Sequence, residues 1–320
     1  MRLSKPRSMV DRKRSMRHLV RALVIMVAGT ALAVAIPGVR DRGTLLLRKV
    51  SGASSASWSE LAVRLLPHRW QDDASRMLGH WTVEWNRNLS FPLQLGSKTR
   101  LSYRISLGAT PNLGSLDCHY TVLAEGQTPH PPHVHEDEEI IVPFVGDVDI
   151  LRGRAADSTE TQDERIGYGR LVYHTSSLPH TIRAVGPGPS GYLVLRWSAP
   201  ASEGTPDGAV SAQSFDFGKP LAAEPSATEG RSRTLIFEGP TRLLHRLHAH
   251  VSFARPGEGS PPHQDPHDVA VIVIEGAVET TSGRVEAPGI IFHPAGRTHF
   301  LRSIGTQPAR YLAIEFLKRN

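Results

Sequence analysis

Four side chains have the types and the spacing of a metal site. His133 and His135 are two residues apart, so both imidazoles would lie on one face of an extended segment, where side chains alternate. Glu139 follows His135 by four residues, and this even spacing returns its carboxylate to the same face if a strand continues. His180 comes later, beyond the Gly146 turn. Three imidazoles and a carboxylate suit one divalent Mn, Fe, Ni, Cu or Zn ion per chain, and they leave coordination positions open for a substrate or dioxygen.

The segments around these residues occur twice in the chain. The run PPHVHEDEEIIVPFVGDVD from Pro131 aligns without gaps on PPHQDPHDVAVIVIEGAVE from Pro261, and YHTSSLPHTIRAVG from Tyr173 aligns on FHPAGRTHFLRSIG from Phe292. From about residue 89 onward, short alternating segments such as LSYRISL and YLVLRW are separated by Gly and Pro, which is typical of strands. These patterns predict an all-β body made of two copies of one domain.

The first copy resembles the two signature motifs of the cupin superfamily, and the repeat resembles a two-domain member, a bicupin. The resemblance covers about residues 89–200 and 210–320 and implies two tandem double-stranded β-helix (cupin) barrels, with His133, His135, Glu139 and His180 as metal ligands in the first. The matching positions are Gly126, His133-x-His135-x3-Glu139-x6-Gly146 and Pro179-His180. Thr175 and Ser177 stand where the family has proline and glycine, so the turn before His180 is expected to differ.

The second copy carries an altered cluster. His263, Asp265 and His299 occupy three of the ligand positions, but Val269 stands where the glutamate should be, and a valine side chain cannot bind a metal. One interpretation is a degenerate barrel with a mainly structural role. The other is a second metal site of two histidines and one carboxylate, a set that suits non-haem Fe(II).

Two further features bear on this second cluster. Together with Arg310, its ligand order resembles that of Fe(II)/2-oxoglutarate oxygenases, although the spacing between the motifs is short and similar to that of cupins. His267 and Asp268 are the other candidate ligands. The sequence does not choose between them.

Four other histidines occur at equivalent positions of the two copies. They could line the interior of a barrel and orient a ligand imidazole or exchange a proton with a substrate, or they could be half-buried strand residues. They are His119, His174, His250 and His293. Asp137 and Glu138, beside the proposed ligand Glu139, are expected to face solvent.

The N-terminal segment has the layout of an export signal. Eight basic residues lie between Arg2 and Arg21, and an uncharged run follows from Ala22 to Val39. The segment 1–39 is therefore predicted to be a signal peptide or an uncleaved signal anchor, which places the body outside the cytoplasm, in the periplasm or beyond. Apolar residues then recur at helical spacing from Trp58 to Leu65, which predicts a short helical cap or a contact with the membrane.

These observations divide the chain into five predicted parts. They are residues 1–39 as signal, 40–88 as linker and helical cap, 89–200 as the first barrel with the metal site, 201–232 as linker, and 233–320 as the second barrel with a degenerate site.

Composition excludes several functions. Residues 1–50 hold 12 Lys and Arg against two Asp, whereas the remaining 270 residues hold 25 basic and 29 acidic side chains, so the body is mildly acidic and nucleic acid is not an expected partner. The single cysteine, Cys118, rules out a disulfide within the chain. Membrane contact is expected only through the N-terminal segment, and the resemblance implies a homodimer.

The sequence leaves two classes of function open. In one, the protein is a metal-dependent enzyme acting on a small oxygen-rich substrate, and the resemblance implies dioxygenase, decarboxylase or isomerase chemistry, including an Fe(II) oxygenase centred on the second barrel. In the other, it is a non-catalytic module that binds or senses a sugar, a carboxylate or a metal. Because one fold supports many activities, fold alone does not decide between them.

Overall fold

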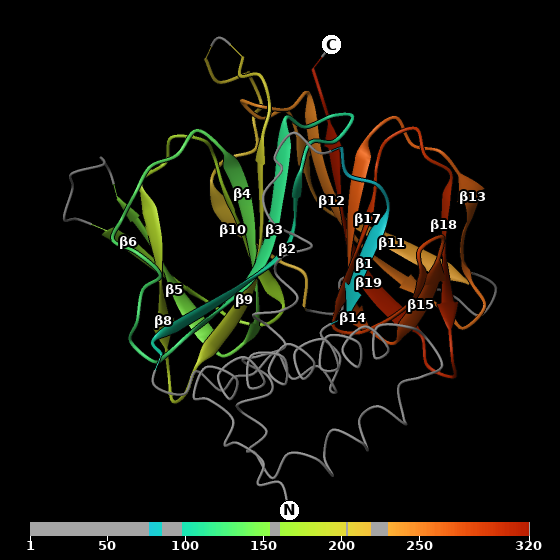
Figure 1. Ribbon diagram of the computed structural model, residues 1–320, viewed down its shortest axis with the longest axis horizontal. Coiled ribbons are helices and arrows are strands. Elements are labelled where there is room, and N and C mark those ends of the chain that lie inside the picture. Colours follow the sequence, from blue (N-terminus) through green and yellow to red (C-terminus); the bar gives the residue numbers. More distant parts are fainter. Residues whose placement is uncertain (1–76, 85–97, 154–160, 203, 219–229, 320) are drawn as a thin grey trace, which may run out of the picture. The chain divides into compact units, whose positions relative to one another are not determined.

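The computed structural model describes residues 77–84, 98–153, 161–202, 204–218 and 230–319 (Figure 1). Within these ranges the regular structure consists of β-strands, as the all-β prediction requires, and no helix there is long and apolar enough to cross a membrane. The predicted signal, residues 1–39, and the predicted helix around residues 58–65 lie outside the described residues.

The strands form two pairs of sheets, one for each copy of the repeat. In the N-terminal half, a six-stranded sheet has the order β10-β7-β4-β9-β3-β2 and a three-stranded sheet has the order β6-β5-β8. The bounds are β2 Arg100–Gly108, β3 Ser115–Leu123, β4 Glu138–Val145, β5 Asp147–Gly153, β6 Thr161–Ile166, β7 Arg170–His174, β8 His180–Val185, β9 Ser190–Ser198 and β10 Gln213–Asp216.

The C-terminal half repeats this arrangement. Its six-stranded sheet has the order β1-β17-β14-β19-β12-β11 and its four-stranded sheet the order β13-β18-β15-β16. The bounds are β1 Trp81–Glu84, β11 Arg231–Gly239, β12 Arg246–Ala254, β13 Gly259–His263, β14 Asp268–Glu275, β15 Ala277–Thr280, β16 Gly283–Glu286, β17 Gly289–His293, β18 His299–Ile304 and β19 Ala309–Leu317.

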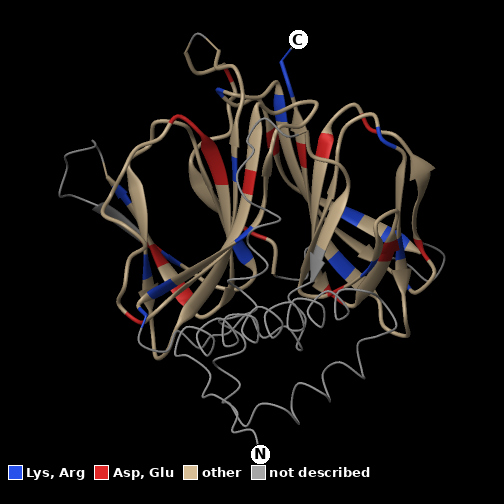
Figure 2. Cartoon of the chain, in the orientation of Figure 1, with Lys and Arg blue, Asp and Glu red and all other residues tan. Residues whose placement is uncertain are grey.

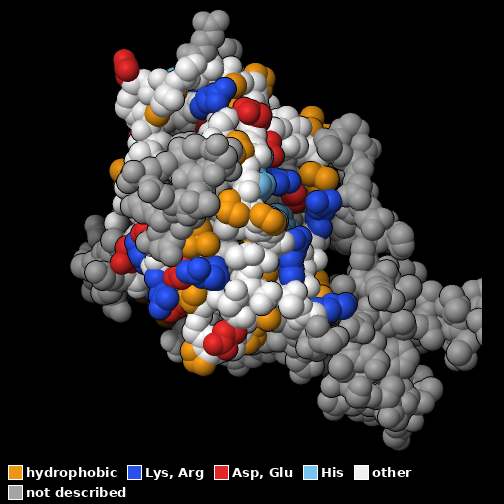
Figure 3. All heavy atoms as spheres, turned by 90° about the vertical axis from the view of Figure 1, so that its left-hand side faces the viewer, with side chains coloured by type: hydrophobic (Ala, Val, Ile, Leu, Met, Phe, Trp, Pro, Cys, Tyr) orange, Lys and Arg blue, Asp and Glu red, His pale blue; other side chains and the backbone are white. Residues whose placement is uncertain are grey.

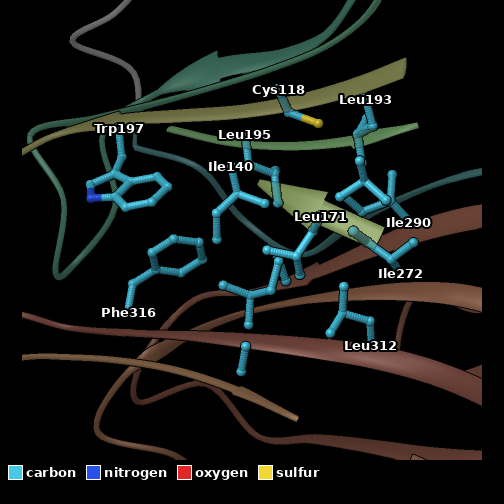
Figure 4. Close-up of a cluster of buried hydrophobic side chains, with 14 of the residues drawn as sticks. Cys118, Ile140, Leu171, Leu193, Leu195, Trp197, Ile272, Ile290, Leu312 and Phe316 are labelled. Atoms are coloured by element: carbon cyan, nitrogen blue, oxygen red, sulfur yellow. The ribbon is translucent and has the colours of Figure 1, made fainter. Parts of the chain in front are cut away.

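Each six-stranded sheet is buried on both faces, which explains the long apolar runs in its strands. Strand β9 shows the principle: Leu195 and Trp197 belong to the cluster shared by the two halves, whereas Tyr192 and Val194 belong to the cluster inside the N-terminal half. The shared cluster brings together side chains such as Leu193 of the first half and Ile272, Leu312 and Phe316 of the second (Figure 4). The halves therefore share one hydrophobic core.

Two strands lie in the sheet of the opposite half. Strand β1 precedes the N-terminal half in sequence but pairs antiparallel with β17, where Figure 1 shows it in cyan among orange strands. The Trp81 ring stacks on Phe292 with ring centroids 5.6 Å apart. Likewise β10, inside the segment predicted as linker, pairs with β7 of the N-terminal half.

Glu138 is fully buried, contrary to the expectation that it faces solvent. Acidic residues begin β4 (Figure 2), and because Glu139 faces the interior of its own half, the preceding side chain must face the other half. There Glu138 accepts hydrogen bonds from Thr241 Oγ1 at 2.7 Å and from the Leu243 backbone N–H at 3.2 Å. These partners offset part of the cost of burying the carboxyl group, whose pKa burial nevertheless raises.

The C-terminal half makes the reciprocal contact. Asp268, at the position of Glu138, accepts hydrogen bonds from Thr110 Oγ1 of the first half and from the Ala295 backbone N–H, the latter at 2.8 Å. In each half, a threonine hydroxyl thus donates a hydrogen bond to a buried carboxyl group of the other half. Asp268 is engaged in this contact and is not part of the cluster of His263, Asp265 and His299.

Candidate metal centre

Backbone pairing brings the two predicted motifs together. His133 and His180 form an isolated antiparallel bridge, in which each backbone N–H donates to the carbonyl oxygen of the other at 3.1 Å. Glu139 lies at the start of β4 and His180 at the start of β8. Residues 47 positions apart in the chain therefore meet at one end of the N-terminal half.

The four predicted ligands lie close together in two overlapping groups. One nitrogen from each of His133, His135 and His180 lies within 4.8 Å of the others, and Glu139 forms a second such group with His174 and His180. Glu139 Oε1 is 2.7 Å from His180 Nε2, and Glu139 Oε2 is 3.8 Å from His135 Nε2. The donor types, three imidazole nitrogens and one carboxylate, fit a borderline divalent metal.

The orientation of the imidazoles is fixed by the backbone. His133 Nδ1 lies 3.2 Å from the His180 carbonyl oxygen, His135 Nδ1 2.9 Å from that of Asp137, and His180 Nδ1 2.7 Å from that of Leu178. A carbonyl oxygen only accepts, so Nδ1 must carry a proton in each ring. In His133 and His135 this leaves Nε2 with its lone pair, the form that binds a metal through Nε2. His180 Nε2 lies 2.7 Å from Glu139 Oε1 and carries a proton, which a bound metal would displace.

Burial and the contacts with Glu139 set the charges of the side chains in this cluster. Burial, with some help from the neighbouring histidines, lowers the pKa of His133 to about 4, so this ring is neutral at pH 7. Although burial raises the pKa of Glu139, hydrogen bonds from His174 and His180 outweigh it and hold that pKa well below its ordinary value. Burial lowers the pKa of His180, but its contact with Glu139 raises it overall.

Two of the additional histidines lie at this centre. His174 is fully buried, and its Nδ1 is 2.9 Å from Glu139 Oε1, so it can hold the carboxylate in place. His119 lines the cavity described below, with its Nδ1 3.4 Å from Asp117 Oδ1. Thus His174 touches a proposed ligand, whereas His119 faces the space in front of the ligands.

A cavity of about 70 Å³ opens over the cluster. Its walls include His133, Glu139 and His180 together with Arg100, His130 and Arg196. On the face of the N-terminal half, Figure 3 shows histidine side chains between basic and acidic groups. Arg196 is neutralised by Asp117 at 3.2 Å and Asp137 at 3.4 Å, whereas Arg100 donates to the carbonyl oxygen of Pro129 and, within the described ranges, pairs with no carboxylate. Arg100 therefore places in the cavity wall a positive charge that no carboxylate of the described residues neutralises.

The turn before His180 keeps the conformation of its counterpart despite the sequence change. Ser177 has φ of 61°, and Gly296 at the equivalent position has φ of 70°. The Ser177 N–H donates to the carbonyl of His135 at 2.8 Å, as the Gly296 N–H does to that of Asp265. The turn therefore does not differ as expected, and a serine occupies a left-handed conformation that favours glycine.

Replacing Ser177 with glycine is expected to stabilise the protein. The left-handed conformation costs a non-glycine residue roughly 1 kcal/mol, and the hydrogen bonds that the hydroxyl makes with Glu136 and Arg242 lie near the surface, where they add little. Thermal unfolding should show a rise in Tm of about 2–4 °C. Gly296→Ala is the matched control and should lower Tm, since nothing but φ opposes its Cβ. A fall in Tm for Ser177→Gly would contradict the strain argument.

The C-terminal half gathers its three predicted ligands as well. Asp265 Oδ2 lies 3.4 Å from His263 Nε2 and 3.3 Å from His299 Nε2. His293 stacks on His299 with ring centroids 4.3 Å apart. Val269 packs in the hydrophobic interior of this half.

Arg310, one of the residues on which the resemblance to Fe(II)/2-oxoglutarate oxygenases rests, does not lie at the second cluster. Arg310 pairs with Glu275 at 2.8 Å and donates to the Phe217 carbonyl oxygen at 3.2 Å. It is thus engaged away from His263, Asp265 and His299.

Several residues of these sites are absent from the sequence-based prediction. The ring centroids of His130 and His133 lie 3.9 Å apart, and His80 Nδ1 lies 2.9 Å from His293 Nδ1. Glu315 and His248 form a cluster with His250. A signal was present for one of them, since His248 and His250 alternate on β12; the position of Glu315 depends on strand pairing.

Comparison with known proteins identifies the fold. Neither a protein-family model nor a curated sequence matches the chain. Among solved structures it is similar to a cupin 2 conserved barrel domain protein from Leptotrichia buccalis, with a TM-score of 0.52 and 15% identity over 76% of this chain and 100% of that chain. A protein from Pseudomonas aeruginosa described as glyoxylate-induced gives a TM-score of 0.57 and 14% identity, over 78% and 94% of the two chains.

An oxalate decarboxylase gives a TM-score of 0.50 and 16% identity, over 78% of this chain and 80% of that one. At these identities the likeness concerns the fold. The protein has a cupin fold with clusters of histidine and carboxylate side chains that can hold a metal, as the sequence motifs predicted.

Proposed function

We propose that this protein is an exported, metal-dependent enzyme of two tandem cupin barrels that acts on a small carboxylate. One divalent ion would be held by His133, His135, Glu139 and His180. The observation that carries the proposal is the set of three Nδ1 atoms directed at backbone carbonyl oxygens, because this arrangement turns the three Nε2 atoms toward one another beside a carboxylate.

The metal would act as a Lewis acid and as a template for an oxygen-bearing substrate. Three side chains around the metal would each have a different role. Arg100 is placed to bind a substrate carboxylate through charge-assisted hydrogen bonds. His119 lies in the same cavity outside the proposed ligands and can exchange a proton with the substrate. His174 holds Glu139, so that the carboxylate keeps its orientation.

The size of the cavity limits the substrate. A volume of about 70 Å³ is small for a ligand pocket, so it favours a substrate with few non-hydrogen atoms. Oxalate and glyoxylate are carboxylates of this size. They are also sensible first probes because two similar folds carry these compounds in their names. Decarboxylation, oxygenation or isomerisation of such a compound is the chemistry to assay.

Replacing Arg100 with methionine is expected to raise KM for the carboxylate about 10- to 100-fold, because a charge-assisted hydrogen bond contributes about 1.5–3 kcal/mol. The measurement is steady-state turnover of oxalate and glyoxylate by the metal-loaded protein under oxygen. Arg183→Met is the control, since Arg183 pairs with Asp149 at 2.8 Å outside the cavity and should leave KM within twofold. Equal KM values for both variants would contradict a carboxylate substrate bound by Arg100.

The second candidate function is a non-catalytic binding module. Arg100 and Arg196 in the cavity wall favour it, because arginine side chains can bind a carboxylate without any transfer of a proton. Stabilisation of the metal-loaded protein by a carboxylate, without turnover of any compound tested, would support the module over the enzyme.

Export rests on the sequence of residues 1–39. Fractionation of the native cells is expected to place the protein outside the cytoplasm, either soluble after cleavage or anchored. A homodimer through sheet edges also stays a prediction, to be tested by the mass of the purified protein in solution.

A further inference from the structure

A second cluster of metal-binding side chains lies in the C-terminal half, beside the position where Val269 replaces the glutamate. One atom from each of His248, His250 and Glu315 lies within 4.8 Å of the others. Strand β12 carries the two histidines and β19 carries the glutamate, and His248 and Glu315 are direct cross-strand partners. None of these three occupies a motif position of the repeat.

The C-terminal half has a carboxylate on β19, the strand next to β14, where Val269 replaces the glutamate. Val269 on β14 pairs directly with Glu315 on β19, so the two side chains are neighbours on the inner face of the same sheet. In the N-terminal half the positions of His248 and Glu315 are occupied by Asp117 and Arg196, which form an ion pair at 3.2 Å. The N-terminal half thus has an ion pair at these two positions, whereas the C-terminal half has a histidine and a glutamate, which can both bind a metal.

The hydrogen bonds around the cluster orient it for a cation. His248 Nδ1 is 2.6 Å from Glu238 Oε2, and since a carboxylate accepts, this nitrogen carries the proton and Nε2 has the lone pair. That Nε2 lies 3.0 Å from His250 Nδ1. Two facing nitrogens at this distance share one proton, which a metal bound to both would displace.

Glu315 is held in a similar way. His267 Nε2 lies 3.2 Å from Glu315 Oε2, which leaves Oε1 directed toward His250 Nδ1 at 3.8 Å. Arg246 also approaches Oε2, at 3.6 Å. Ligand atoms on one metal ion lie about 3–3.5 Å apart when each bond is about 2.1 Å long, so small side-chain shifts would bring the three atoms to that geometry.

The cluster is partly shielded from water. His250 is 2% exposed, and His267, which contacts Glu315, is 8% exposed. Burial of this kind limits the competition of water for a bound cation.

We propose that His248, His250 and Glu315 form a second metal site, distinct from the motif positions, for a borderline divalent cation such as Zn²⁺. His267 positions the glutamate and Glu238 positions His248, as carboxylates position ligand histidines in metalloproteins. The site does not depend on the function proposed above, because it uses none of the N-terminal residues.

The competing site in this half is the group of His263, Asp265 and His299, which has its own carboxylate. This allows a matched pair of conservative variants, Glu315→Gln and Asp265→Asn, each exchanging one carboxylate for an amide of the same shape. Both are made in the full-length chain that also carries His133→Ala and His180→Ala, so that metal bound by the N-terminal half does not contribute.

The measurement is titration with Co²⁺ and Zn²⁺, followed by Co²⁺ visible absorption and by metal content per chain. We expect about one ion per chain in the background protein, an affinity at least 10-fold weaker after Glu315→Gln, and an affinity within about twofold after Asp265→Asn. Binding that survives Glu315→Gln, or that is lost only in Asp265→Asn, would overturn the proposal.

A second measurement tests the proposal even if the protein with His133→Ala and His180→Ala does not fold. In the otherwise unmodified chain, Glu315→Gln should reduce the metal content by one ion per chain and leave the circular dichroism spectrum unchanged. An unchanged metal content in this variant would also overturn the proposal, whatever the N-terminal site binds.

Discussion

Replacing both His133 and His180 with alanine is expected to lower the metal content by one ion per chain and to abolish turnover. These residues supply two of the three oriented Nε2 atoms, and their backbone bridge joins the two motifs. Losing even a partner that only orients a ligand weakens metal binding 10- to 100-fold, so losing two ligands should weaken it more than 100-fold. Elemental analysis of protein purified without chelator, and reloaded with each candidate ion, measures the effect.

His263→Ala/His299→Ala is the control for this experiment. It removes two histidines from the corresponding positions of the other half and should leave the N-terminal metal and the activity intact. If metal and activity are instead lost in this control and retained without His133 and His180, the catalytic centre lies in the C-terminal half and the proposed function is wrong.

Replacing Trp81 with alanine is expected to destabilise the whole described fold by about 3–5 kcal/mol. Trp81 is only 8% exposed, stacks on Phe292 and holds β1 on the edge of a sheet that belongs to the opposite half. Because the halves share one core, the loss should appear as a lower midpoint of a single cooperative transition in denaturant.

The nearby Met77 provides the comparison for Trp81. It is 60% exposed, so Met77→Ala should change the stability by no more than about 0.5 kcal/mol. Two separate transitions in the unmodified protein, or a loss below about 1 kcal/mol for Trp81→Ala, would show that β1 does not couple the halves.

Much of the fold and of the N-terminal site could be predicted from local patterns. The spacing of His133, His135 and Glu139 indicated one face of an extended segment, and the repeat related His180 to His299. Alternation with a period of two and the Gly and Pro turns indicated strands. These features depend on residues near one another in the chain, so their geometry follows from the backbone of a single strand or turn.

The tertiary structure alone decided the rest, because it depends on which strands become neighbours. The burial of Glu138 follows from the second sheet that covers β4, and the strand exchange of β1 depends on a partner more than 200 residues away. The left-handed Ser177 is held by a hydrogen bond to His135 in another motif. Glu315 lies beside Val269 only through the register of β14 and β19, since pairing between distant strands has no signature in the spacing along either one.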